Sequence, residues 1–470
     1  MQEYKKAWEY TREIVEKMIP FPERAKRVPF DAIIDEGARD LDKMKALWHS
    51  LHEEARTNLF NLAYMVQDKG NMGYDVSEAE KLLAEGLYDL ARNNEIGLYR
   101  ITCRLFRALH NAPKIPSHPY WSYTQYESFE QYKNSVEFPK YDKLKISREE
   151  LYDRIYAGWM AQVCAGAVGT PLEGYHTINI ENVYGWVDGY TKMPEMYNDD
   201  LTFELVFLEE FIKAGNDVKA DDIAEMWAAR IPSGYTAELI ALNNIKNGIY
   251  PPESGTYKNP FSEFIGAQMR GGVCGMVAPA NPELAAELAW RDATISHANN
   301  GILGEVFNAV MVSLGFVESD LKKICRMAID MMPKDSEYRN VVEYAWKACE
   351  KYGNWRDAWI DCDDKYKEYC WIHAYPNAAI EVIALYFCEN DFNKLVSITA
   401  MCGLDVDCNA AQVANIPAVY HGMKIIDEKL WKPFGEYMET YLRGMEKIRY
   451  DDLAEETVSA IIKAGNVEII

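Results

Sequence analysis

The feature that most constrains the fold is the recurrence, along most of the chain, of apolar side chains spaced three and four residues apart. The segments "ARDLDKMKALWHSLHEEARTNLFNLAYMV" and "ISREELYDRIYAGWMAQVCAGAVG" show this spacing, which is typical of amphipathic α-helices. Strand-like alternation is short everywhere. The stretch "YHTINIENVYGWV" comes nearest to it, and we interpret it as a loop with a brief strand. The chain is therefore predicted to be all-α.

Several of the predicted helices are rich in small residues, as in "GILGEVFNAVMVSLGF" and "NAAQVANIPAVYHG". Small side chains let helix axes approach each other closely. The chain has 470 residues, of which 49% are hydrophobic, so it has ample material for a core. We expect a compact multi-helix domain with buried central helices.

A segment rich in Pro, Tyr and Ser, residues 113–147, interrupts the helical pattern and is the predicted domain boundary. It separates an N-terminal helical domain, residues 1–112, from a larger helical domain, residues 148–470. The first domain shows no catalytic constellation. Two roles stay open for it: it covers the active-site face, or it joins copies of the chain into a homo-oligomer.

The charge and the cysteines limit the partners and the compartment. A net charge of −23 repels phosphate backbones and anionic lipid, so neither nucleic acid nor a membrane is an expected partner. The sequence lacks both an apolar run of about 20 residues and a secretory apolar region near its start. Ten cysteines are scattered without a CxxC pair, which suits a reducing compartment. We expect a cytoplasmic protein.

Four short segments combine small residues with chemically active groups. They are "AGAVGTPLEG" with Glu173, "YNDDLT" with Asp199 and Asp200, "RDATISHANNGILGE" with His297, and "CGLDVDCNAAQVA" with Asp405 and Asp407. Each has an ordinary explanation by itself. Asn198 is a favoured N-cap residue, and acidic residues after a cap are stabilised by the helix dipole. The other groups suit turns, caps or solvated loops.

Considered together, these segments predict a metal centre. Their five carboxylates would crowd negative charge if the helix ends converged, and divalent cations would neutralise it. Hard oxygen ligands select Mg²⁺, Ca²⁺ or Mn²⁺ over zinc. Two such ions close together can activate a water molecule. The predicted chemistry is metal-assisted hydrolysis.

The motifs "GTPLEG", "NDDLT", "NPFSEFIGAQMRGG", "PANPELAAELAWRDATISHANNGI" and "GLDVDCNAAQVANIPAVYHG" resemble, in order and content, those of the ADP-ribosylglycohydrolase family over residues 146–423. The resemblance implies an all-α fold with a magnesium centre of one or two ions. It also implies a hydrolase that cleaves the anomeric bond of an ADP-ribosylated or related ribosyl substrate with a metal-activated water.

The resemblance also assigns residues. The metal ligands it implies are Asn198, Asp199, Asp200, Asp405, Asp407 and Cys408. Glu173 corresponds to the glutamate that orients or deprotonates the attacking water. Ser296 and His297 correspond to the segment that lines the ADP-ribose pocket. The glycine content of "RGGVCG" adds Gly271 and Gly272, whose backbone N–H groups would hold the diphosphate.

The sequence departs from the family pattern at three positions. Asn198 and Cys408 replace threonines of the common metal motif, and Gly166 stands where many members have an aspartate. A cysteine sulfur is soft and poorly matched to Mg²⁺. Two alternatives to the leading function therefore stay open. One is a non-catalytic protein that binds an ADP-ribose-like nucleotide or serves structurally; the other is a metal-dependent hydrolase of a different ribosyl or phosphate compound.

Overall fold

A computed structural model of the chain describes residues 5–19, 31–52, 57–192 and 199–470. The chain divides into two compact units, residues 1–47 and 48–470. The borders predicted at residues 112 and 147 fall inside the second unit, which also contains the candidate site.

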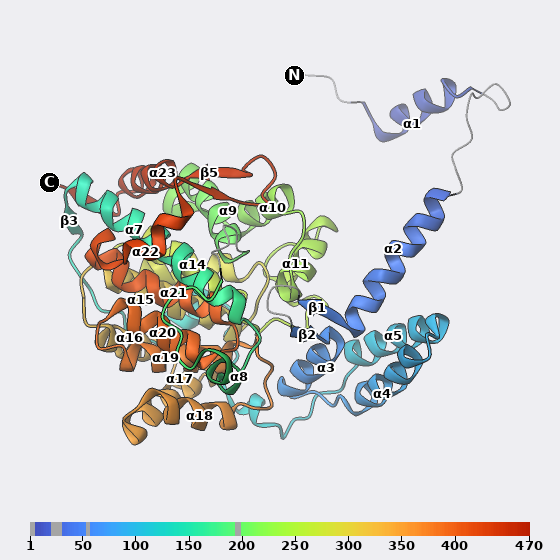
Figure 1. Cartoon of the computed structure of the whole chain (residues 1–470). Coiled ribbons are helices and arrows are strands. Elements are labelled where there is room, and N and C mark those ends of the chain that lie inside the picture. Colours follow the sequence, from blue (N-terminus) through green and yellow to red (C-terminus); the bar gives the residue numbers. More distant parts are fainter. Residues whose placement is uncertain (1–4, 20–30, 53–56, 193–198) are drawn as a thin grey trace. The chain divides into compact units, whose positions relative to one another are not determined.

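Helices dominate the described residues (Figure 1). The α-helices are α1 Ala7–Glu16, α2 Asp31–Trp48, α3 Asn61–Asn71, α4 Ser77–Ala91, α5 Glu95–His110, α6 Phe129–Lys133, α7 Arg148–Gly169, α8 Thr177–Tyr184, α9 Asp199–Ala214, α10 Ala220–Arg230, α11 Thr236–Lys246, α12 Glu253–Thr256, α13 Gly271–Met276, α14 Pro282–Ala293, α15 Asn300–Gly315, α16 Leu321–Asp330, α17 Glu337–Tyr352, α18 Trp355–Lys365, α19 Ala374–Phe387, α20 Phe392–Cys402, α21 Val406–His421, α22 Glu428–Trp431 and α23 Tyr450–Lys463. The 3₁₀ helices are η1 Pro119–Ser122, η2 Thr170–Leu172, η3 Gly215–Asp217, η4 Gln268–Arg270, η5 Met423–Ile425 and η6 Lys432–Phe434.

The strands are short and pair only two at a time within the described residues. They are β1 Ser50–His52, β2 Thr57–Leu59, β3 Leu144–Ile146, β4 Tyr437–Glu439, β5 Lys447–Arg449 and β6 Val467–Ile469. β1 and β2 pair antiparallel, as do β4 and β5, whereas β3 runs parallel to β6. The all-α prediction is confirmed. Among the described helices, none combines the length and the hydropathy that a membrane span requires.

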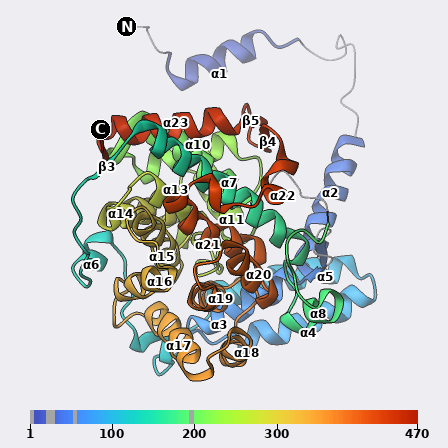
Figure 2. The same ribbon diagram turned by 60° about the vertical axis from the view of Figure 1, so that its left-hand side comes forward.

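The core of the second unit is built around α7, α15 and α21. Every residue of α15 is buried, as are the residues of α21 from Val406 to Val419. α7 and α21 pack along each other inside the helical body, and both views show them as neighbours (Figure 2). The buried central helices predicted from small residues are therefore present.

Gly169, the last residue of α7, allows the start of α21 to lie very close to the end of α7. A Cβ atom built on Gly169 would lie 2.3 Å from the backbone nitrogen of Asp407. No real side chain fits at that distance, so only glycine lets the first turn of α21 abut the end of α7. The chain that continues from α7 through η2 to Glu173 is thereby brought beside the start of α21.

Helix α8 corrects one prediction. The stretch that we interpreted as a loop with a brief strand contains an eight-residue helix, Thr177–Tyr184. Its β-branched residues alternate in a strand-like way, but tertiary contacts fix the helix. Thr177 Oγ1 donates to the carbonyl of Cys402 at 2.9 Å and accepts from Trp359 Nε1 at 2.7 Å.

Within the second unit, polar contacts join α3, which precedes α7, to later parts of the chain. Gln67 Nε2 of α3 donates to the carbonyl of Glu368 at 2.6 Å. His373 Nε2, at the start of α19, lies 3.1 Å from Asp68 Oδ1, and both side chains are buried. Because Tyr375 N donates to His373 Nδ1, the ring proton stands on Nε2 and faces the aspartate.

Candidate metal centre

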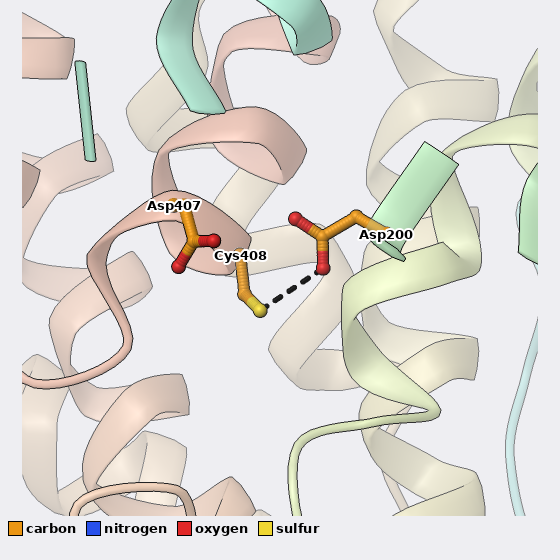
Figure 3. A group of neighbouring side chains, drawn as sticks. All are labelled: Asp200, Asp407 and Cys408. Carbon is orange, nitrogen blue, oxygen red and sulfur yellow. Dashed lines mark hydrogen bonds between the residues drawn. The ribbon is translucent and has the colours of Figure 1, made fainter. Parts of the chain in front are cut away.

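The first acidic motif lies at the start of α9. Asn198 lies outside the described residues, and Asp199 is the first residue of the helix. Asp200 follows it and is fully buried. The thiol of Cys408, on the first turn of α21, donates to Asp200 Oδ1 at 3.0 Å (Figure 3). Two segments about two hundred residues apart in the sequence therefore meet.

The second acidic motif lies at the start of α21, where backbone pairing brings Glu173 toward it. Gly174 N donates to the carbonyl of Leu404 at 2.8 Å, and Leu404 N donates to the carbonyl of Tyr175 at 2.8 Å. This pairing needs Gly403, because a Cβ there would lie 2.2 Å from the Tyr175 oxygen. The loop after η2 and the loop before α21 are thus held edge to edge.

Asp405 occupies the N-cap position of α21, yet its side chain makes no capping hydrogen bond. Its backbone N–H donates instead to Asn377 Oδ1 of α19 at 3.3 Å, and Asn409 Nδ2 donates to the same oxygen at 2.7 Å. The side-chain oxygen of Asn377 therefore stabilises the first turn of α21. Helix capping, the ordinary explanation of an aspartate here, does not account for the Asp405 carboxylate.

Two groups of possible donor atoms result, and they share one residue. Asp200, Asp407 and Cys408 form one group; Glu173, Asp405 and Asp407 form the other. Within each group, one ligand atom from every residue lies within 4.8 Å of the others. Donors bound to one ion at about 2.0–2.6 Å lie at most about 4–5 Å apart, so each group has the span of a single ion site. Of these residues, only Glu173 is partly exposed.

The chemistry of the donors differs between the two groups. Glu173, Asp405 and Asp407 offer only carboxylate oxygens, the ligands that suit Mg²⁺. The other group replaces one oxygen by the sulfur of Cys408. The residues present therefore fit a divalent ion in both groups and fit magnesium fully in one.

A buried polar layer lies one helical turn beyond these candidate ligands. Glu204 follows Asp200 by four residues, and Gln412 follows Cys408 by four. Gln162 Nε2 of α7 donates to Glu204 Oε2 at 3.0 Å, and Gln412 Nε2 donates to Glu204 Oε1 at 3.3 Å. Burial raises the pKa of Glu204 to about 8. The layer joins α7, α9 and α21 directly behind the candidate ligands.

The structure places Ser296 and His297 in a buried chain of hydrogen bonds. Arg270 Nη2 donates to Ser296 Oγ at 2.9 Å, and Ser296 Oγ lies 2.7 Å from His297 Nδ1. His297 Nε2, on the other side of the ring, lies 3.9 Å from Glu238 Oε1. Burial, followed by the charge of Arg270, lowers the pKa of His297 well below its usual value, so the ring is neutral. Contact with a ribose or phosphate stays a prediction.

Arg270 is the centre of a second carboxylate cluster. Its guanidinium contacts Asp292 closely, lies 3.1 Å from Glu238 Oε1 and 3.5 Å from Glu305 Oε2, and all four side chains are buried. Burial, reinforced by the nearby Asp292, raises the pKa of Glu305 well above its usual value. Burial also raises the pKa of Asp292 and that of Glu238. Burial thus favours the protonated forms of these carboxyl groups, which lie around a fixed cation.

Gly271 and Gly272 lie at the start of α13, where both are buried against other helices. A Cβ on Gly271 would lie 2.6 Å from the carbonyl oxygen of Glu305. A Cβ on Gly272 would lie 2.7 Å from Asn415 Nδ2 and 2.9 Å from Glu204 Oε1. Close helix packing accounts for both glycines. Their predicted role in binding a diphosphate is untested.

No sequence motif predicted the Glu204 layer or the partners of Arg270. For Glu204 and Gln412 a signal existed, because a residue four positions after a ligand lies on the same helix face. No comparable sequence signal marked Glu238, Asp292 or Glu305. They come from three different helices, α11, α14 and α15, and resemble ordinary helix residues until the fold joins them.

The fold and the site define a class: an all-α protein that gathers acidic side chains at the starts of two helices. Comparison with known proteins identifies the family. The family model described as ADP-ribosylglycohydrolase matches residues 147–464, about two thirds of the chain, and the chain belongs to this family. A solved structure titled "ADP-ribosylglycohydrolase-related protein complex" is similar at 17% sequence identity and a TM-score of 0.47, covering 67% of this chain and 99% of that one. No curated protein matches the sequence.

Proposed function

We propose that the chain is a metal-dependent hydrolase of the ADP-ribosylglycohydrolase type, which cleaves the anomeric bond of an ADP-ribosylated or related ribosyl substrate. The observation that carries the proposal is the meeting of two acidic motifs at Asp407, a residue common to both donor groups. Membership of the ADP-ribosylglycohydrolase family over residues 147–464 supports the class of reaction.

The chain's own residues have distinct tasks in this proposal. Asp200, Asp405 and Asp407 hold the metal, with Mg²⁺ as the ion of the oxygen-only group. When bound, divalent ions supply positive charge that orients substrate hydroxyls and lowers the pKa of a nearby water. The carboxylates are buried, which strengthens electrostatic interactions between them and a bound substrate.

Glu173 is the proposed general base. It is partly exposed and has a carboxylate oxygen within 4.8 Å of ligand atoms of Asp405 and Asp407. The backbone pairing of Gly174 with Leu404 fixes its position. In the proposed reaction Glu173 takes the proton of the attacking water while positive charge develops at the anomeric carbon.

Glu173→Gln tests this role. The glutamine keeps the size of the side chain but cannot accept a proton, so kcat should fall by about 100- to 10,000-fold. We would measure release of ADP-ribose from conjugates linked through nitrogen and through oxygen, with Mg²⁺ present. The partly exposed carboxylate of Glu181 on α8, paired with Arg356 of α18, offers the control Glu181→Gln. Unchanged kcat in Glu173→Gln would remove Glu173 from the mechanism.

A second candidate function is a non-catalytic protein on the same fold. The hydrogen bond from the Cys408 thiol to Asp200 favours it, because a thiol donor stabilises that carboxylate without an ion. Calorimetry with ADP-ribose distinguishes the two. Binding of ADP-ribose together with no hydrolysis of any conjugate in the panel would favour the binding protein.

The compartment and the assembly belong to the same proposal. We place the reaction in the cytoplasm, where the ten free cysteines would stay reduced. We also retain the proposal that residues 1–112 cover the active-site face or join copies of the chain. Light scattering of the full chain beside a chain lacking residues 1–47, the first compact unit, tests the contribution of that unit to self-association.

A further inference from the structure

The two donor groups of the candidate centre differ in a way that predicts different metal preferences. Glu173, Asp405 and Asp407 offer oxygen alone, whereas the group of Asp200 and Asp407 is completed by the sulfur of Cys408. Hard Mg²⁺ prefers oxygen, and thiolates select borderline ions such as Zn²⁺ and Co²⁺. One centre therefore combines two kinds of site.

The surroundings of Cys408 reinforce the difference. Its sulfur lies 3.0 Å from Asp200 Oδ1 and 3.9 Å from the thioether sulfur of Met269. Both sulfur-bearing residues are buried, at 5% exposure each. Two polarisable sulfur atoms thus lie close together, one of them beside Asp200, whereas the group of Glu173, Asp405 and Asp407 contains only carboxylate oxygens. A buried cysteine is often only a small hydrophobe, but this one points its sulfur at a candidate ligand.

We propose that the centre is mixed: Asp405 and Asp407 of the oxygen-only group bind Mg²⁺ beside the general base Glu173, and the group of Asp200, Asp407 and Cys408 binds a borderline divalent ion of the zinc or cobalt class. Cys408 binds as a thiolate. Its proton passes to solvent when the sulfur–metal bond forms, and the hydrogen bond from the thiol to Asp200 is replaced by the ligation of both groups. The inference rests on the proposed function in one respect, that Asp407 holds metal.

Titration of the whole 470-residue chain with Co²⁺, in the presence of Mg²⁺, tests the inference without any assay of activity. Thiolate bound to Co²⁺ gives a charge-transfer absorption in the near-ultraviolet, which oxygen ligands do not give. The band should appear at about one equivalent of Co²⁺. It should be lost in Cys408→Ser, with Co²⁺ affinity at least about tenfold lower.

The matched control is Cys103→Ser. Cys103 is the exposed cysteine of the ten, so it is the thiol that free Co²⁺ would reach most easily. The band should persist in Cys103→Ser. A band that survives in Cys408→Ser, or one that disappears in Cys103→Ser, would overturn the inference. Circular dichroism of each variant reports whether it has folded.

Asp407→Asn separates this inference from the proposed function. If Co²⁺ stabilises the wild-type protein against heat, and Asp407→Asn abolishes that effect while no sulfur band is seen, the metal centre stands and only the role of Cys408 fails. If neither Mg²⁺ nor Co²⁺ stabilises the wild-type protein, the metal centre of the proposed function fails, and the inference fails with it.

Discussion

The second unit contains two clusters of carboxyl side chains, and the two clusters differ in the other side chains that lie among the carboxyl groups. One surrounds Arg270, whose guanidinium lies within 3.5 Å of three carboxyl groups. The other gathers acidic side chains and a thiol around Asp407. In the first cluster the positive charge is part of the chain and permanent. In our proposal the second cluster takes its charge from exchangeable ions, which suits a site that must leave coordination positions open for a substrate.

The largest effect is expected from a change at Asp407, because this residue belongs to both donor groups. Asp407→Asn should lower turnover of an ADP-ribose conjugate by about 1,000-fold or more, as loss of a central catalytic group does. It should also abolish stabilisation by divalent ions, which at 100 times the dissociation constant amounts to about 2.7 kcal/mol. Steady-state kinetics and thermal unfolding with and without Mg²⁺ measure both effects.

The control for Asp407 is Asp222→Asn. Asp222 also lies in the first turn of a helix, α10, but it is exposed. This variant should match the wild-type protein in turnover and in its response to Mg²⁺. If Asp407→Asn also matches the wild-type protein in turnover and in its response to Mg²⁺, the cluster around Asp407 does not depend on exchangeable ions, and Asp407 contributes only to the fold.

A change at Arg270 should act on stability, whatever the metal concentration. Arg270→Met removes the guanidinium and leaves Glu238, Asp292 and Glu305 buried around an apolar side chain. Breaking such a buried ionic cluster costs about 3–5 kcal/mol of unfolding free energy. Urea unfolding measures the loss, which should be the same with Mg²⁺ and with a chelator.

Arg104→Met provides the comparison, because Arg104 pairs with Glu85 at the surface, where both side chains are more than half exposed. It should change stability little. A loss in Arg270→Met that Mg²⁺ reverses would mean that the Arg270 cluster also binds metal, so that the two clusters would not differ in the source of their positive charge.

The last change, at Glu381, is expected to act only through pH; this buried carboxyl lies outside both clusters. Gln268 Nε2 and Asn308 Nδ2 donate to its Oε1 at 3.0 and 3.1 Å, and burial raises its pKa to about 8. The native state therefore keeps a proton that the unfolded chain releases above about pH 4.5. Stability from this group is present at low pH and is lost as pH rises toward 8, by about 1.4 kcal/mol per pH unit.

Glu381→Gln keeps the acceptor oxygen and removes the titration. Between about pH 5 and 8, its unfolding free energy should fall less steeply than that of the wild-type protein, by up to about 1.4 kcal/mol per pH unit. The exposed Glu368 supplies the control Glu368→Gln, which should follow the wild-type curve. Parallel curves for Glu381→Gln and the wild-type protein would show that Glu381 is ionised in the native state.

The packing of the central helices could be predicted because it depends on local sequence. Runs of Ala, Gly and Ser on α15 and α21 predict close helix contacts, and Gly169 makes one of them at the end of α7. The prediction failed at α8, where the pattern was strand-like. There the decisive contacts come from Trp359 and Cys402, far along the chain, so a local pattern did not contain them.

The candidate site could be predicted only in part. Acidic pairs beside glycines, at the starts of helices, suggested that Asp200 and Asp407 would meet, and the structure brings them together with Cys408. That they bind metal stays a prediction. The hydrogen-bond partners of Ser296 and His297 could not be predicted from the sequence. The guanidinium that donates to Ser296 belongs to Arg270, which is 26 positions away.

The most direct test of the contrast between fixed and exchangeable charge is a crystal structure of the full chain soaked in MnCl₂, with data collected for anomalous scattering from manganese. We predict an anomalous peak about 2.0–2.3 Å from a carboxylate oxygen of Asp407, and none within the Arg270 cluster. A well-ordered Asp407 without a peak at millimolar Mn²⁺, or a peak among Glu238, Asp292 and Glu305 instead, would contradict the account.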